Sequence, residues 1–78
     1  MQVKILLFGA TADEVGSREL VRNSAGKTSD EFLKEFVSEF PGLTKHKLLF
    51  AVNQEYARGT EILEDGDEIA VFTAVSGG

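Results

Sequence analysis

The last residues of the sequence have the clearest chemical potential. The chain ends in Val75-Ser76-Gly77-Gly78, directly after a segment typical of a buried strand. A terminal carboxylate becomes an acyl donor only after activation, for example when it attacks the α-phosphorus of ATP and forms an acyl-adenylate. Because glycine has no Cβ, such a tail could enter a narrow active site on another protein. The pattern predicts a tail that carries a reactive acyl group at Gly78; the simpler alternative is a frayed chain end.

Three other sequence patterns give only weak evidence for a binding or catalytic site. The segment 26–28 resembles the end of a phosphate-binding loop, but Val21 occupies the position of the required earlier glycine. His46 lies between two lysines, without a neighbouring metal ligand or nucleophile, and we expect a solvated loop histidine. The acidic segment 64–68 surrounds Gly66, so a turn is favoured over a general acid–base pair.

Composition narrows the class of protein. The 78 residues predict one domain, 1–78, with a flexible tail at 76–78. The absence of cysteine excludes a disulfide framework and thiolate metal sites. Thirteen acidic against 8 basic residues give a net charge of −5, which disfavours nucleic acid and anionic membranes as partners. The longest apolar run, 5–8, is too short to span a membrane, and we expect a cytoplasmic protein.

One helix stands out among the predicted elements. Thr28 and Glu31 match a capping box, and apolar residues recur at helical spacing from Phe32 onward, so we expect a helix over 29–40. Pro41-Gly42 should end this helix, with the glycine in a left-handed cap.

The remaining elements are strands and one helical turn. One amphipathic helix covers a single face of a sheet, so we expect a two-layer α+β fold. The first strand reads as buried on both faces. The predicted strands are 2–8, 19–23, 48–53 and 68–75, segment 55–57 is a short strand or a turn, and the helical turn is 12–15.

Several segments together resemble the ubiquitin-like sulfur carriers of the MoaD/ThiS family, and among them the small subunits of molybdopterin synthase. The resemblance covers nearly the whole chain. One departure is Thr73-Ala74, where family members commonly carry two prolines. The segments that carry the resemblance are VKILLFG, TSDEFLKEFVSEFPGL, AVNQEYA, LEDGDEIAVF and the terminal VSGG.

The resemblance implies a β-grasp fold with a mixed sheet and a role as sulfur carrier. Gly78 would be adenylated by an activating enzyme similar to ubiquitin E1 proteins, which uses ATP, and converted to a thiocarboxylate by a sulfurtransferase. The large synthase subunit, joined in a heterotetramer, would hold the cyclic pterin phosphate that receives the sulfur on the way to the molybdopterin dithiolene. The chain itself would be a non-catalytic subunit that binds no cofactor or metal.

Strand alternation indicates a docking surface near the tail. Ile69 and Val71 share one face of the last strand, and Phe72 lies on the other. If the helix covers Val71, then Phe72 stays on the open face, where it would contact a partner; the alternative is a small second core under a loop. The resemblance places Tyr56 on a partner-contacting surface too.

Three other functions use the same features. A ubiquitin-like modifier would join Gly78 to lysines through an isopeptide bond. A plain β-grasp binding module would have an incidental Gly-Gly end. The thiamine-pathway sulfur carriers share the tail and the fold, but their chains tend to be shorter in the middle.

Overall fold

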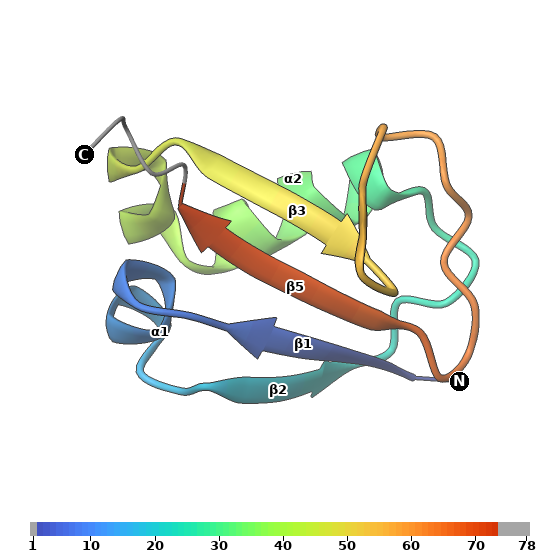
Figure 1. Cartoon of the computed structure of the whole chain (residues 1–78), viewed down its shortest axis with the longest axis horizontal. Helices are drawn as coiled ribbons and strands as arrows, with labels where there is room; N and C mark the ends of the chain where they lie inside the picture. Colours follow the sequence, from blue (N-terminus) through green and yellow to red (C-terminus); the bar gives the residue numbers. More distant parts are fainter. Residues whose placement is uncertain (1, 74–78) are drawn as a thin grey trace.

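The computed structural model describes residues 2–73, and residues 1 and 74–78 lie outside the description. One five-stranded sheet has the order β2-β1-β5-β3-β4 (Figure 1). The central strands β1 and β5 pair in parallel and the other neighbours are antiparallel, so the sheet is mixed. The elements are β1 (Val3–Leu7), α1 (Ala10–Val15), β2 (Glu19–Arg22), α2 (Ser29–Glu39), the 3-10 helix η1 (Pro41–Lys45), β3 (Leu48–Val52), β4 (Glu55–Tyr56) and β5 (Glu68–Thr73).

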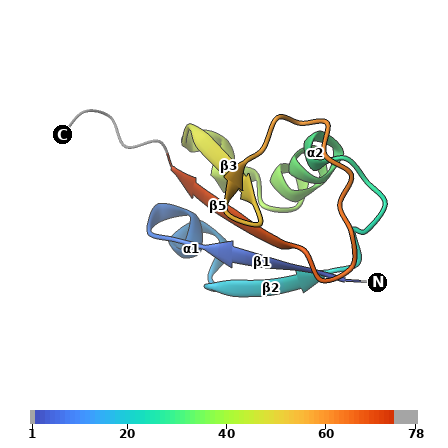
Figure 2. The same cartoon turned by 45° about the vertical axis from the view of Figure 1, so that its right-hand side comes forward.

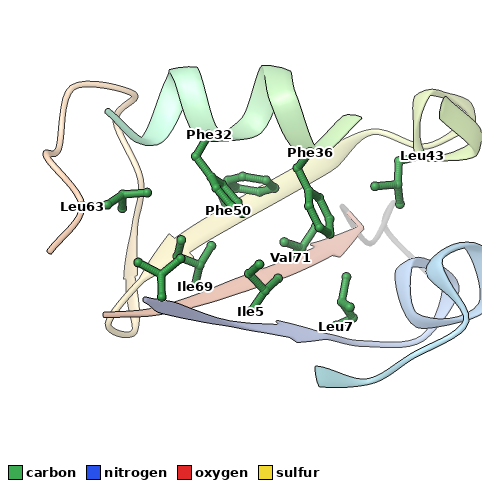
Figure 3. Packing of buried hydrophobic residues seen from close by; sticks show 10 residues of the cluster. Ile5, Leu7, Phe32, Phe36, Leu43, Phe50, Leu63, Ile69 and Val71 are labelled. Carbon is green, nitrogen blue, oxygen red and sulfur yellow. The ribbon is translucent and has the colours of Figure 1, made fainter. Parts of the chain in front are cut away.

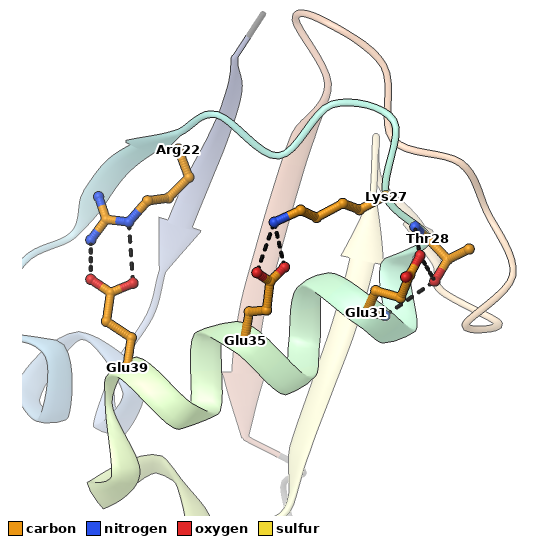
Figure 4. Close-up of polar contacts among 6 residues, drawn as sticks. All are labelled: Arg22, Lys27, Thr28, Glu31, Glu35 and Glu39. Atoms are coloured by element: carbon orange, nitrogen blue, oxygen red, sulfur yellow. Dashed lines mark hydrogen bonds and ion pairs between the residues drawn. The ribbon is translucent and has the colours of Figure 1, made fainter.

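The main helix begins as its sequence predicts. The Thr28 hydroxyl accepts a hydrogen bond from the Glu31 amide at 3.1 Å, and the Glu31 carboxylate accepts one from the Thr28 amide at 2.9 Å (Figure 4). Further along α2, Glu39 pairs with Arg22 of β2 at 2.6 Å. Both partners are partly exposed, so the pair adds little stability and mainly connects α2 to the edge of the sheet.

The end of α2 differs from the prediction. The capping residue is Phe40, and Pro41 starts the 3-10 helix η1 directly afterwards. Gly42 does not have a positive φ, so the predicted left-handed glycine cap is wrong. Gly42 lies instead beside α1, where an added Cβ would meet the Glu14 carboxylate at the end of its flexible side chain. The residue therefore takes part in a tertiary contact with α1 and does not cap the helix.

The core lies between α2 and one face of the sheet (Figure 3). The Phe36 ring packs between Phe32 and Phe40, with centroid separations of 5.5 and 5.1 Å. The expected helix stripe is confirmed. The expectation that β1 is buried on both faces is wrong, because α2 covers only one: Lys4 is exposed and Leu6 half-buried. The buried cluster comprises Val3, Ile5, Leu7, Phe32, Phe36, Leu43, Phe50, Leu63, Ile69 and Val71.

A long connection between β4 and β5 passes the start of α2 (Figure 2). The Glu61 carboxylate connects this segment to α2, because it accepts a hydrogen bond from the Ser29 hydroxyl at 2.7 Å. It also accepts hydrogen bonds from the amides of Arg58 and Gly59 at 2.7 and 3.0 Å. The Ser29 bond first, and then the amide bonds, lower the pKa of Glu61 from 4.5 to about 2. This loop then places Leu63 in the core.

Candidate functional site

The predicted reactive tail follows the central strand of the sheet. Val75, Ser76, Gly77 and Gly78 lie outside the described residues, so their roles stay predictions. The last described residue, Thr73, belongs to β5 and pairs with Leu48 of β3. β5 lies between β1 and β3, and it ends on the side of the molecule where α1 and η1 lie (Figure 1). The last described strand before the tail is therefore paired on both sides.

A buried hydroxyl holds the end of that strand. The Thr11 side chain is fully buried, and its Oγ1 lies 2.8 Å from both the Val71 and the Phe8 carbonyl oxygens. The Thr11 hydroxyl has one hydrogen, so it donates to only one of these two carbonyls at a time. Its oxygen also accepts a hydrogen bond from the Phe8 amide at 3.0 Å. Thr11 thus connects α1, the end of β1 and β5. The sequence analysis missed this residue; a threonine two positions after Gly9, at the start of a helical turn, was the only available signal.

The predicted partner-binding aromatics lie together on the face of the sheet that α2 leaves uncovered. Val71 is fully buried beneath α2, so Phe72 points to the other face, as alternation predicts. Its ring lies 6.2 Å from that of Tyr56 at an interplanar angle of 46°. Tyr56 is 71% exposed and Phe72 half-buried, so the aromatic pair presents apolar surface to solvent. Their role in partner binding stays a prediction.

Neighbouring strands extend this surface, which we call the open face. Strand register puts Leu49 opposite Phe72, and Ala51 opposite both Ala70 and Tyr56. Beyond β5, Leu6 pairs with Ala70 in the same row. Contiguous exposed apolar surfaces mark interaction sites more often than isolated apolar residues do. The open face comprises Leu6, Leu49, Tyr56, Ala70 and Phe72, with Ala51 buried among them.

The carboxylates of the acidic segment 64–68 take part in a turn. Asp67 accepts a hydrogen bond from the Glu64 amide at 2.8 Å, and Asp65 accepts one from the Gln2 amide at 2.6 Å, which confirms the turn interpretation. Among residues 2–73, no group of three or more His, Cys, Asp or Glu side chains could hold a metal ion. Within that same range no helix is long and apolar enough to cross a membrane.

The expectation for His46 is wrong. This side chain is half-buried, and its Nε2 atom lies 3.5 Å from the Glu14 Oε1 atom without a hydrogen-bond partner. The packing of η1 against α1 creates this contact between residues distant in sequence. Sequence neighbours alone therefore did not reveal it.

Comparison with known proteins identifies a family and relatives that resemble this chain over nearly its whole length. The family model described as the ThiS family matches residues 5–78. The molybdopterin synthase sulfur carrier subunit of Arabidopsis thaliana is 31% identical over 100% of this chain and 84% of its own length. The human protein of the same name is 36% identical, over 99% and 94%.

Solved structures agree on the architecture. The crystal structure of SAMP1 from Haloferax volcanii superposes with a TM-score of 0.84 at 28% identity and covers 100% of both chains. A complex of subunits 1 and 2 of the molybdopterin-converting factor from Helicobacter pylori contains a chain with a TM-score of 0.72 at 23% identity, again with 100% of both chains covered. At that identity the second likeness shows the fold alone.

The fold and the relatives together define the class: a ubiquitin-like β-grasp protein, with one helix over one face of a mixed sheet. Within this class, the chain belongs to the ThiS family, and curated relatives over its whole length are sulfur carrier subunits of molybdopterin synthase. The fold and family expected from the sequence are confirmed.

Proposed function

We propose that this chain is the sulfur carrier subunit of molybdopterin synthase. The observation that carries the proposal is its relation to several proteins of that name, at 31–37% identity over essentially the whole chain. The geometry is compatible with the role. The central strand β5 leads to the tail, and an apolar open face lies beside the strand's end.

The proposed chemistry takes place at Gly78. Its carboxylate oxygen attacks the α-phosphorus of ATP on an E1-like activating enzyme, and pyrophosphate leaves. The terminal sulfur of a sulfurtransferase persulfide then attacks the acyl carbon and displaces AMP. A thiol attacks the outer sulfur of the resulting acyl disulfide, which releases Gly78 as a thiocarboxylate and forms a disulfide with the sulfurtransferase. ATP is thus a substrate of the partner enzyme, and this chain needs no cofactor of its own. Gly77 and Gly78 have no Cβ, which suits a tail that must enter a narrow active site.

The proposed acceptor complex is with the large subunit of molybdopterin synthase. In the Helicobacter pylori structure, subunits 1 and 2 of the converting factor are found in one complex. The open face, with Phe72 and Tyr56, is the surface that we propose for docking, because exposed aromatics are frequent hot spots of interfaces. The large subunit would hold the anionic pterin phosphate, and a carrier with net charge −5 would not need to bind it.

Intact-mass measurement on protein isolated from cells tests the carrier role. A fraction heavier by one exchange of oxygen for sulfur is expected, located at Gly78 by peptide fragmentation. A variant without Gly78, or with one residue appended after it, should be folded but unable to support sulfur transfer. An extended protein that still supports cofactor synthesis without being trimmed to Gly78 would contradict the proposal.

A second candidate function is conjugation to protein lysines. The likeness to SAMP1, whose solved structures include one described as small archaeal modifier protein 1, favours it specifically. Adenylation of Gly78 would be common to both functions, but here the acyl carbon would be attacked by a lysine amine. Proteome digestion with chymotrypsin, which cleaves after Phe72, distinguishes them: lysine peptides that carry residues 73–78 indicate the modifier, and a thiocarboxylate without such peptides indicates the carrier.

A further inference from the structure

The outer edge of β3 is only half covered. β4 pairs with β3 at two positions, Ala51 and Val52. The Phe50 carbonyl accepts one more hydrogen bond, from the Ala57 amide at 2.9 Å, before the chain leaves the sheet. In the part of the chain that the structure describes, segment 48–50 therefore has β5 on one side and no strand on the other.

The backbone groups at this edge are available for pairing. In an antiparallel sheet, alternate residues direct their N–H and C=O groups to the same side. Because Phe50 directs its carbonyl outward, Leu48 does the same, whereas Leu49 faces its partner Phe72 in β5. Between residues 2 and 73, the Phe50 amide and both backbone groups of Leu48 have no backbone partner at this edge. Such groups form the template that an added strand uses.

A groove of about 440 Å³ follows the same edge and has apolar side chains on both walls. On the side of α2 the wall is formed by Leu33 and Leu48, which pack partly buried against the core. On the other side it is formed by Leu49 and Tyr56. Successive side chains of a strand point to opposite faces. An added strand would therefore place one side chain against each wall in turn.

Two charged side chains line the groove, Asp30 and Arg58, and the Asp30 carboxylate pairs with Lys34 of α2 at 3.3 Å. Arg58 lines the groove, and Lys45 and Lys47 come just before β3. The ion pairs found within residues 2–73 involve none of these three cations. Two copies paired through this edge would bring like charges together, which disfavours a second copy as occupant. Acidic residues on a partner would complement them.

We propose that the β3 edge groove, formed by Leu33, Leu48, Leu49, Tyr56 and Arg58, binds an extended segment of a partner protein whose apolar residues are flanked by acidic ones. The segment adds to the sheet beside β3 and pairs with the backbone of Leu48 and Phe50. At about 3.3 Å per residue, the free stretch engages roughly three to five residues of the partner. The proposal does not depend on the chemistry at Gly78.

Titration with a synthetic peptide tests the groove. The probe is the capped peptide Asp-Asp-Val-Ile-Val-Ile-Asp-Asp, followed by amide NMR signals of the full chain. We expect shifts centred on Leu48, Phe50 and Arg58, and slower hydrogen exchange of the Leu48 and Phe50 amides. The same peptide with proline at its central valine lacks a backbone donor and should bind at least about tenfold more weakly. No shifts at millimolar peptide, or shifts centred on β2, would overturn the proposal.

A pair of charge-reversal variants tests the role of Arg58. Arg58→Glu should weaken peptide binding by about tenfold, whereas Arg18→Glu makes the same charge change beside β2 and should leave it unchanged. Equal weakening by both variants would indicate unspecific attraction and contradict the groove. Sedimentation equilibrium without peptide should show a monomer. A dimer that the peptide dissociates would make a second copy the occupant and overturn the proposal.

Discussion

The Thr11 Oγ1 atom lies 2.8 Å from the Val71 carbonyl oxygen and so connects α1 to the strand that leads into the tail. Sixty residues separate the two along the chain, and the hydroxyl is fully buried. A buried carbonyl without a donor is costly, so this bond matters more than its net strength suggests. Thr11 is therefore a positioning residue for the end of β5.

Thr11→Val tests this relationship, because valine has nearly the same shape but no hydroxyl. We expect a loss of about 1–3 kcal/mol in the free energy of unfolding, since the Val71 carbonyl and the Phe8 amide lose a partner. Urea denaturation provides the measurement. Thr11→Ser keeps the hydroxyl and should recover part of the loss; a Val variant as stable as the wild type would show that the bond is unimportant.

Phe36→Ala tests the core. The Phe36 side chain is 2% exposed and packs between two other rings, so its removal should cost about 3–5 kcal/mol through lost burial and the cavity left behind. Small domains have only about 5–15 kcal/mol in total, so a large fraction of the variant could unfold on mild heating. Phe8→Ala removes a ring that is 51% exposed and serves as the control. Equal melting temperatures for the two variants would contradict the assigned helix face.

The hydrogen-bonded Glu61 carboxylate predicts a pH dependence of stability. Its pKa is about 2 in the folded chain, against an ordinary value of 4.5, because the Ser29 hydroxyl and the Arg58 and Gly59 amides favour the charged form. The stabilisation is therefore complete above pH 4.5 and is lost as the pH falls toward 2. Glu61→Gln should be less stable than the wild type at neutral pH, and urea midpoints of the two should converge across that window.

Glu55→Gln is the matched control for this pH series, because Glu55 is an exposed carboxylate of β4. Its urea midpoint should follow the wild type at every pH. A stability difference between the wild type and Glu61→Gln that stays constant from pH 7 to pH 2 would show that the Gln variant acts through packing, without the linked proton.

Phe72→Asp tests the open face as a docking surface for the large synthase subunit. An aspartate there would have to lose its hydration at the interface, so we expect binding weakened by more than about tenfold with a native circular dichroism spectrum. Ile62→Asp changes an exposed apolar residue in the β4–β5 connection and should bind normally. Calorimetric titration decides: wild-type affinity of Phe72→Asp rules out this docking surface, and a collapsed spectrum assigns Phe72 a structural role beside Tyr56.

Local patterns in the sequence were sufficient for most of the elements. The capping box at Thr28 and the apolar spacing after it predicted α2 within one residue of its observed end at Glu39. Alternation in the last strand placed Val71 under the helix and Phe72 on the opposite face. These predictions succeed because capping, helical periodicity and strand alternation depend on residues close together in the chain.

Contacts between distant segments were decided only by the tertiary structure. The packing of η1 against α1 brings Gly42 and His46 to Glu14, and the fold brings Thr11 to Val71 and Glu61 to the start of α2. The free edge at β3 likewise depends on how soon β4 ends. By itself the sequence determined the elements, the apolar face of the helix and the family. It could not determine these contacts, because a hydroxyl or a carboxylate has no local preference among partners that lie tens of residues away.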